Sequence, residues 1–144
     1  MKLLFRTGWR LTTFILVLIL GLTACSGEGF TASGTQTQSS ETLDGGTHTV
    51  HLDKAQGSAT ESMELKEGAD ATLDAAVTLA VGKGSFKIEL LGADEKVTLT
   101  LEARDGQTVD GTGTLVADSF GAAKYRVTAN NAENVTYQIV YTYR

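Results

Sequence analysis

The 144-residue chain has no proline, two histidines, one tryptophan and one cysteine. Because Cys25 stands alone, no internal disulfide can form, and the fold must be stabilised by its hydrophobic core. The longest apolar run, from Leu11 to about Leu22, is about a dozen residues long, well short of the ~20 that a membrane-spanning helix needs. The absence of proline is unusual for a loop-rich β protein, and the sequence offers no physical reason for it.

Basic residues are also scarce. The chain has 12 Lys and Arg against 17 Asp and Glu, a net charge of −5. Lys2, Arg6 and Arg10 precede the apolar run and no acidic residue does, so the remainder has 9 basic and 17 acidic side chains, or −8. A surface this acidic repels nucleic-acid phosphates and anionic lipid headgroups, so we expect neither nucleic-acid binding nor direct headgroup binding.

No pattern of a catalytic centre is present. No serine lies in a G-x-S-x-G context or beside an evident base. The carboxylates of Glu61, Glu64, Glu67 and Asp70 are expected to spread along a solvated edge, where they serve solubility. We therefore predict a protein that is not an enzyme, with no catalytic residues.

Metal ligands are equally sparse. His48 and His51 have H-x-x-H spacing, but "THTVHLD" alternates like a strand, where residues three apart point to opposite faces. We expect one ring on the surface, the other near the edge of the sheet, and no shared metal. Asp105, Asp110 and the segment 130–134 offer oxygens that suit calcium, but none fits a known calcium loop, and turn formation explains them better. No cofactor is predicted.

The first residues show a processing pattern. A basic head and an apolar run lead into Leu22-Thr23-Ala24-Cys25, the layout of a secretory signal. This order resembles the lipobox signal peptide of bacterial lipoproteins. The resemblance implies a signal peptide over residues 1–24, cleavage between Ala24 and Cys25, and a diacylglycerol on Cys25, often with a further acyl chain such as palmitate. The alternative is an ordinary signal with an incidental cysteine.

That resemblance also implies a location. The mature protein would be exported and anchored by the lipid on Cys25 in the cell membrane or the outer membrane, with its domain outside the cytoplasm. Ser26, where an aspartate would retain the protein in the inner membrane of two-membrane bacteria, favours the outer membrane. Residues 25–46 are mostly Ser, Gly, Thr and Gln, and we expect a flexible linker with a root-mean-square span of about 25 Å.

Residues 47–144 are expected to form one domain. Apolar residues alternate with polar ones in "ATLDAAVTLAV", "KVTLTLEA" and "NVTYQIVYTYR". A helix over residues 64–80 is the main competitor to the first of these strands. Turns are expected at "VGKGS" and at residues 92–94, 105–106, 118–121 and 130–131. Seven or eight strands, spaced at about ten residues, predict an all-β fold, a single small antiparallel β-sandwich or jelly roll.

The last 60 or so residues contain "GAAKYRVTANNAENVTYQIVYTY". This segment resembles the closing hairpin of small β-sandwich domains appended to secreted bacterial peptidases. The resemblance implies a fold and no functional residue.

A glycan-binding surface would need exposed aromatic side chains. Tyr137, Tyr141 and Tyr143 share a face with Val135 and are expected in the core, with their phenol tips at the rim. Tyr125 is also expected to point inward, and Trp9 lies in the signal, so no exposed aromatic platform is predicted. We expect a non-catalytic envelope module that binds a protein partner; a module for surface polysaccharide, with or without calcium, is the alternative.

Overall fold

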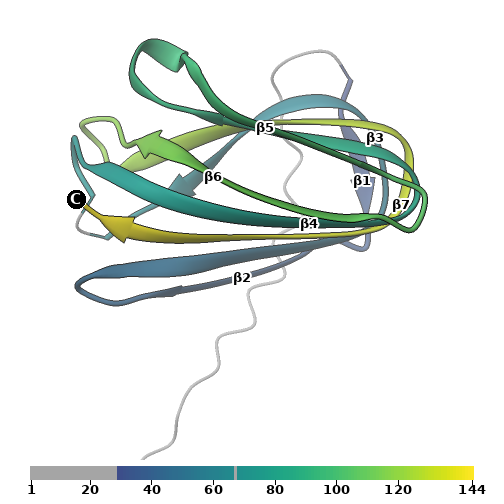
Figure 1. Ribbon diagram of the computed structural model, residues 1–144, viewed down its shortest axis with the longest axis horizontal. Coiled ribbons are helices and arrows are strands. Elements are labelled where there is room, and N and C mark those ends of the chain that lie inside the picture. The colour runs from purple at the N-terminus through teal and green to yellow at the C-terminus, as the bar shows by residue number, and fades with distance from the viewer. Residues whose placement is uncertain (1–28, 67) are drawn as a thin grey trace, which may run out of the picture.

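The computed structural model describes residues 29–66 and 68–144, and nearly all of them lie in antiparallel strands (Figure 1). The elements are β1 (Thr31–Ser33), β2 (Gln36–Glu41), β3 (Gly45–Glu64), β4 (Thr72–Leu91), the short helix η1 (Ala93–Glu95), β5 (Val97–Arg104), β6 (Thr108–Val116) and β7 (Ala122–Tyr143). Within this part of the chain, no helix is both long and apolar enough to cross a membrane.

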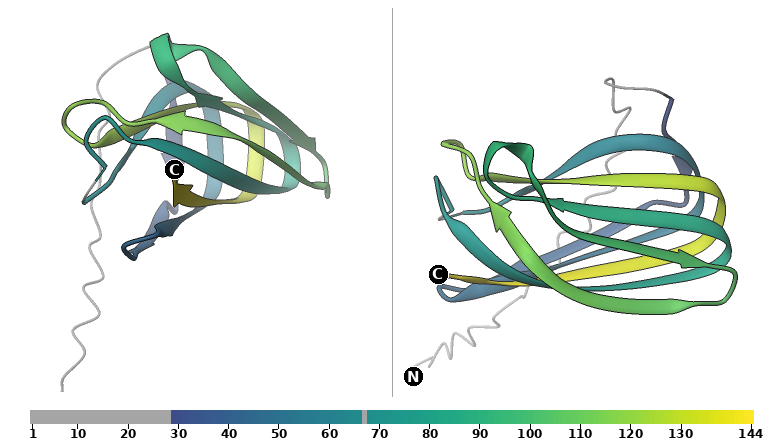
Figure 2. Two further views of the ribbon diagram at one scale, coloured as in Figure 1. Left: turned by 60° about the vertical axis from the view of Figure 1, so that its left-hand side comes forward. Right: turned by 45° about the horizontal axis from the view of Figure 1, so that its top comes forward.

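Three strands of 20 to 22 residues make both layers of a β-sandwich. The ladder of β3 with β7 is interrupted between Ala55 and Gly57, and that of β4 with β7 between Lys83 and Ser85. Beyond each irregularity the same strands continue to pair, but in the other layer (Figure 2). One folded sheet therefore supplies two facing layers.

The bends coincide with a change in the phase of the hydrophobic alternation. In β4 the buried residues are Leu73 to Val81 at odd positions, and then Phe86, Ile88 and Leu90 at even positions. An extra residue at the bulge shifts the alternation of side chains by one position. Even-numbered residues after the bulge therefore point to the same side of the sheet as odd-numbered residues before it, and that side faces inward in both layers. Gly84 at this bend has a φ of +75°, which a glycine adopts without strain.

The first layer has the strand order β2, β3 (45–55), β7 (132–142), β4 (72–83) and β6. The second layer has the order β3 (57–64), β7 (122–129), β4 (85–91) and β5. One side of the sandwich is closed where the hydroxyl of Thr98 in β5 donates to the carbonyl of Thr114 in β6. The opposite side is bounded by β2 in the first layer and β3 in the second.

The all-β prediction is confirmed, and so is the choice of strand over helix before residue 80, since β4 begins at Thr72. The alternation in "ATLDAAVTLAV" is also confirmed, because Leu73 and Leu79 are completely buried. The turns at residues 92–94, 105–106 and 118–121 are present between strands.

Two predicted turns and the C-terminal hairpin are wrong. "VGKGS" lies inside β4, and Asn130–Asn131 lies inside β7, where Asn131 has a φ of +46°. Both are bends of a continuous strand, because each half continues to pair with the same neighbour. β7 therefore passes once through each layer and does not form a hairpin.

The predicted flexible linker is also wrong for most of its length. β1 pairs with Lys54–Gln56 and β2 pairs with Gly46–His51, so residues 31–46 belong to the domain. Backbone pairing compensates for the few apolar side chains there, a contribution that composition does not reveal. The domain begins near Gly29, not at residue 47.

Candidate functional site

The predicted cleavage and lipidation residues, Ala24 and Cys25, lie outside the described residues. Glu67, one of the four candidate carboxylates, does too. Glu64 and Asp70 are exposed, as expected of a solvated edge, whereas Glu61 is half-buried and points into the sandwich with its strand neighbours Ala59 and Met63.

The two histidines lie on opposite faces of β3, as predicted. His51 is on the outer surface, where Nε2 lies 3.2 Å from a carboxylate oxygen of Asp53. His48 is only 7% exposed and lies inside the sandwich. The prediction that its ring would lie near the sheet edge is wrong, because β2 extends the sheet beyond β3 and covers it.

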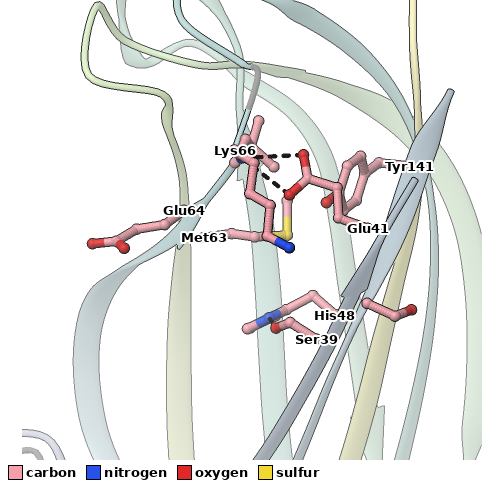
Figure 3. Close-up of a pocket in the computed structure, with 9 residues that line it drawn as sticks. Ser39, Glu41, His48, Met63, Glu64, Lys66 and Tyr141 are labelled. Carbon is pink, nitrogen blue, oxygen red and sulfur yellow. Dashed lines mark hydrogen bonds between the residues drawn. The ribbon is translucent and has the colours of Figure 1, made fainter. Parts of the chain in front are cut away.

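A pocket of about 340 Å³ opens beside His48, between β2 and the end of β3 (Figure 3). Figure 3 shows Met63 directed into this space and Glu64 directed away from it. The polar groups at the wall include Ser39, His48 and Lys66, and the size is at the lower end of small-molecule pockets.

Glu41 fixes one wall of this pocket. Its two carboxylate oxygens accept hydrogen bonds from the backbone N–H of Lys66 at 3.0 and 3.1 Å, and one of them also accepts from the hydroxyl of Tyr143. The end of β2 is thereby attached to the segment after β3 and to the end of β7.

A chain of hydrogen bonds runs from the pocket into the core. Ser39 Oγ lies 2.8 Å from His48 Nδ1, and His48 Nε2 lies 3.2 Å from the Tyr125 hydroxyl. The Tyr125 hydroxyl lies 3.1 Å from that of Tyr137. The four residues come from β2, β3 and both halves of β7, so the chain of bonds joins the two layers.

Burial sets the protonation of these groups. It lowers the pKa of His48 from its ordinary value of 6.5, so the imidazole is neutral at neutral pH. Burial also raises the pKa of Tyr125 and of Tyr137, which keeps both phenols protonated. Half-burial raises the pKa of Glu61, whose strand position is opposite Tyr125.

This arrangement suits recognition better than proton abstraction. Both ring nitrogens of His48 contact hydroxyl groups, and no carboxylate contacts either of them among the described residues. In serine hydrolases a buried carboxylate stabilises the imidazolium that forms when serine is deprotonated. Here the Ser39 hydroxyl and the His48 ring bond to each other at the pocket wall.

The outer face of the first layer is a second candidate site. Threonines project from β3, β4, β6 and β7 on the side opposite to the core, and we call this surface the threonine face. Its members are Thr47, Thr49, Thr78, Thr112, Thr114, Thr136 and Thr142.

A shallow depression of about 540 Å³ lies at one end of the threonine face, over residues 74–76 of β4, 112–114 of β6 and 140–144. Val140, which is 42% exposed, lies at this depression with Thr112 and Thr142. At one end Arg144 donates two hydrogen bonds to one oxygen of Asp74, at 2.7 and 3.0 Å. The surface therefore combines hydroxyls, a small apolar patch and one ion pair.

The outer face of the second layer has a different chemistry. Glu89 there contacts both Lys87 and Arg126 at 3.6 Å, and Glu102 contacts Arg104 at 2.9 Å. Charged pairs of this kind are common on a solvated surface. The threonine face has fewer charges, with Asp53, Asp74 and Asp110 against Arg144, and is dominated by hydroxyls.

Of the residues considered for calcium, Asp105 bonds the backbone, Asp110 is exposed on β6, and the asparagines lie at the bend of β7. Asp105 Oδ1 accepts from the N–H of Gly84 at 2.7 Å, and Asn131 and Asn134 adopt positive φ at the bend of β7. In residues 29–66 and 68–144, no three His, Cys, Asp or Glu side chains are grouped closely enough to hold a metal ion.

Sequence reasoning missed the core hydrogen bonds. The expectation that phenol tips reach the rim is wrong for Tyr137, whose hydroxyl meets that of Tyr125 inside the core, whereas Tyr125 points inward as expected. One signal was available, since His48 alternates in phase with the apolar Val50 and Leu52. The partner Ser39 could not be found, because it belonged to the presumed linker.

Neither a protein-family model nor a curated protein matches the chain. Several solved structures share the strand-rich architecture. A carbohydrate-binding module of Cellvibrio mixtus lichenase 5A in complex with cellotriose is 16% identical over 78% of this chain and 88% of its own, with a TM-score of 0.34. A protein of the Bacillus endospore appendages is 15% identical over 85% and 96%, with a TM-score of 0.42. The CBM22-1 xylan-binding domain of Paenibacillus barcinonensis Xyn10C is 9% identical over 80% and 85%, with a TM-score of 0.36. Similarities this weak support no inference about a ligand.

Proposed function

We propose that this protein is a lipid-anchored, non-catalytic module of the cell envelope whose threonine face binds a neutral surface polysaccharide. The observation that supports this function is the contrast between the two outer faces. A hydroxyl-rich depression with a single ion pair lies on one layer, and several ion pairs lie on the other.

The chemistry of the threonine face matches that of a sugar. A pyranose ring presents hydroxyls that both donate and accept, and a threonine hydroxyl does the same. Val140 and the threonine methyl groups offer apolar contact to the C–H surface of a ring. The pair of Asp74 and Arg144 adds charge-assisted hydrogen bonds at one end, and a neutral glycan avoids repulsion by the acidic chain.

The test is a glycan array followed by calorimetry with any retained glycan. The double variant Thr112→Ala and Thr142→Ala should weaken binding about tenfold or more, since each hydroxyl contributes about 0.5–1.5 kcal/mol. Thr60→Ala with Thr100→Ala makes the same change on the other outer face and should leave affinity unchanged. Retention that disappears with a chelator would assign the site to calcium. Equal loss in both double variants, or no retained glycan, would contradict the threonine face as the site.

The anchor is proposed at Cys25, on the strength of the basic head, the apolar run and the lipobox. Intact-mass spectrometry should find a chain that begins at Cys25 and carries acyl chains. Cys25→Ser should remove the acyl mass and the partition into detergent, whereas Ser26→Ala should keep both. A Cys25→Ser chain of unchanged size that still partitions with lipid would overturn the anchor.

The connection between this proposed anchor and the domain is shorter than the predicted linker of residues 25–46. Gly29 forms a bridge with Ser58, so only residues 25–28 separate the proposed lipid from the fold. Four residues span at most about 14 Å. The anchor would therefore hold the bend of the sandwich, near Ser58, close to the membrane surface.

A protein partner is the second candidate. The observation that favours it is the free edge of β3 at residues 59–64, which pairs with β7 on one side and with no described strand on the other, and which does not overlap the threonine face.

A further inference from the structure

The second layer is one strand shorter than the first at the open side. In the first layer β2 pairs with β3 beyond its partner β7. In the second layer β1 reaches only Lys54–Gln56, and Gly29 bridges only Ser58. Among the described strands, none pairs with residues 59–64 of β3 on the side away from β7. No described residue therefore fills the strand position next to residues 59–64, and β2 faces the end of this edge across the pocket of Figure 3.

Of the features that usually prevent strand addition, this edge has only its acidic charge. Natural sheets protect their edges with charged side chains, lysine above all, with inward-pointing charges, proline, bulges or a covering element. The segment "ATESME" has neither lysine nor proline, and the bulge of β3 precedes it, between Ala55 and Gly57. The pocket of Figure 3 lies at the end of this edge, where Met63 and Glu64 line it.

The acidic side chains along the edge favour a partner segment with a positive charge. Glu61 points inward and is half-buried beside Tyr125, and no cation contacts its carboxylate in the described part of the chain. Glu64 follows on the same strand, facing outward. A half-buried carboxylate is costly without a cationic partner, which a bound segment would supply.

We infer that residues 59–64 of β3 accept an extended segment of a partner protein as an added strand, with a basic side chain of that segment paired to Glu61. A second copy of this chain is a poor occupant. The chain is net acidic, and antiparallel pairing of two such edges would bring their glutamates together. This site is separate from the threonine face and does not depend on polysaccharide binding.

The test uses the full chain in detergent and synthetic nine-residue peptides of alternating threonine and valine. One peptide carries a central lysine, and the matched peptide carries norleucine there. Fluorescence anisotropy should show saturable binding of the lysine peptide, about tenfold tighter than the norleucine peptide. Hydrogen exchange should show that backbone amides within residues 59–64 become protected when the lysine peptide binds.

Two comparisons separate strand addition from simple charge attraction. Glu61→Gln should remove the preference for lysine, whereas Glu133→Gln, the same charge change at the bend, should keep it. Two further peptides carry N-methyl groups, one on the odd-numbered and one on the even-numbered backbone nitrogens. Only one of the two should lose binding, because only alternate N–H groups of an added strand point toward β3.

The inference is overturned if the lysine peptide does not bind at millimolar concentration, if both N-methylated peptides bind equally, or if Glu133→Gln acts like Glu61→Gln. Protection of residues 59–64 in the chain alone that rises with protein concentration would also overturn it, in favour of a second copy as the occupant.

Discussion

His48 and Tyr125 are 77 residues apart in the chain, yet Nε2 of the histidine lies 3.2 Å from the tyrosine hydroxyl inside the sandwich. His48 belongs to the first layer and Tyr125 to the second, so this contact forms only when the folded sheet closes on itself. The protonation of His48 is therefore coupled to closure of the two layers.

The first prediction concerns pH. Because the folded-state pKa of His48 lies below its unfolded value of 6.5, the unfolded chain binds more protons under mildly acidic conditions. His48 should therefore leave stability unaffected above about pH 6.5 and reduce it as the pH falls below that value. Urea unfolding at pH 7.5 and pH 5.5 measures the loss, and His48→Gln should reduce it. His51→Gln removes the other histidine as a control, and an equal reduction there would contradict the assignment.

The second prediction concerns Glu61. Half-burial raises its folded-state pKa above the ordinary 4.5, so its contribution to stability is greatest at low pH and is lost as the pH rises through the folded-state pKa. Glu61→Gln should therefore stabilise the protein at pH 7, and the gain should vanish near pH 4. Glu133→Gln provides the matched control. A destabilised Glu61→Gln protein at pH 7 would mean that the carboxylate has a stabilising partner.

The third prediction concerns the bend of β4. Gly84 and Gly106 have φ of +75° and +73°, so alanine at either should cost about 1–2 kcal/mol in conformational strain. A Cβ at Gly84 would also lie 2.1 Å from the carbonyl oxygen of Asn131, whereas a Cβ at Gly106 meets nothing within 4 Å. Thermal unfolding should show that Gly84→Ala lowers the free energy of unfolding by about 2–5 kcal/mol. Gly106→Ala should lower it only by the conformational strain of about 1–2 kcal/mol. Equal losses would show that the close approach of β4 and β7 is not required.

The fourth prediction concerns the segment once expected to be a linker. A soluble chain that begins at Gly29 should be folded, whereas one that begins at Gly45 lacks β1 and β2 and exposes His48 and the edge of β3. The shorter chain should lose several kcal/mol of stability or aggregate. Unfolding curves of the two chains give the comparison. The same stability in both would restore the linker interpretation.

The strands were predictable because alternation is local. The buried side of β4 from Leu73 to Val81 follows directly from its period of two. The glycines at residues 82–84 also marked an irregularity correctly. Whether a strand turns back there or bends and continues depends on which neighbour pairs with each half, and the local pattern is the same for both.

The candidate sites were less predictable. The threonines of the threonine face could be assigned to the solvent side of their strands, but their assembly into one surface required the order of β3, β7, β4 and β6. The bond between Ser39 and His48 required the pairing of β2 with β3, which polar composition concealed.

Composition and the alternation of neighbouring residues were enough to predict the all-β class, the acidic charge, the absence of an internal disulfide and the inward face of most strands. The three-dimensional structure was needed to show that three long strands bend to serve both layers, that β1 and β2 are strands, and that His48, Tyr125 and Tyr137 meet in the core. Those features depend on backbone pairing between residues far apart in the chain, and such pairing uses groups that every residue has in common.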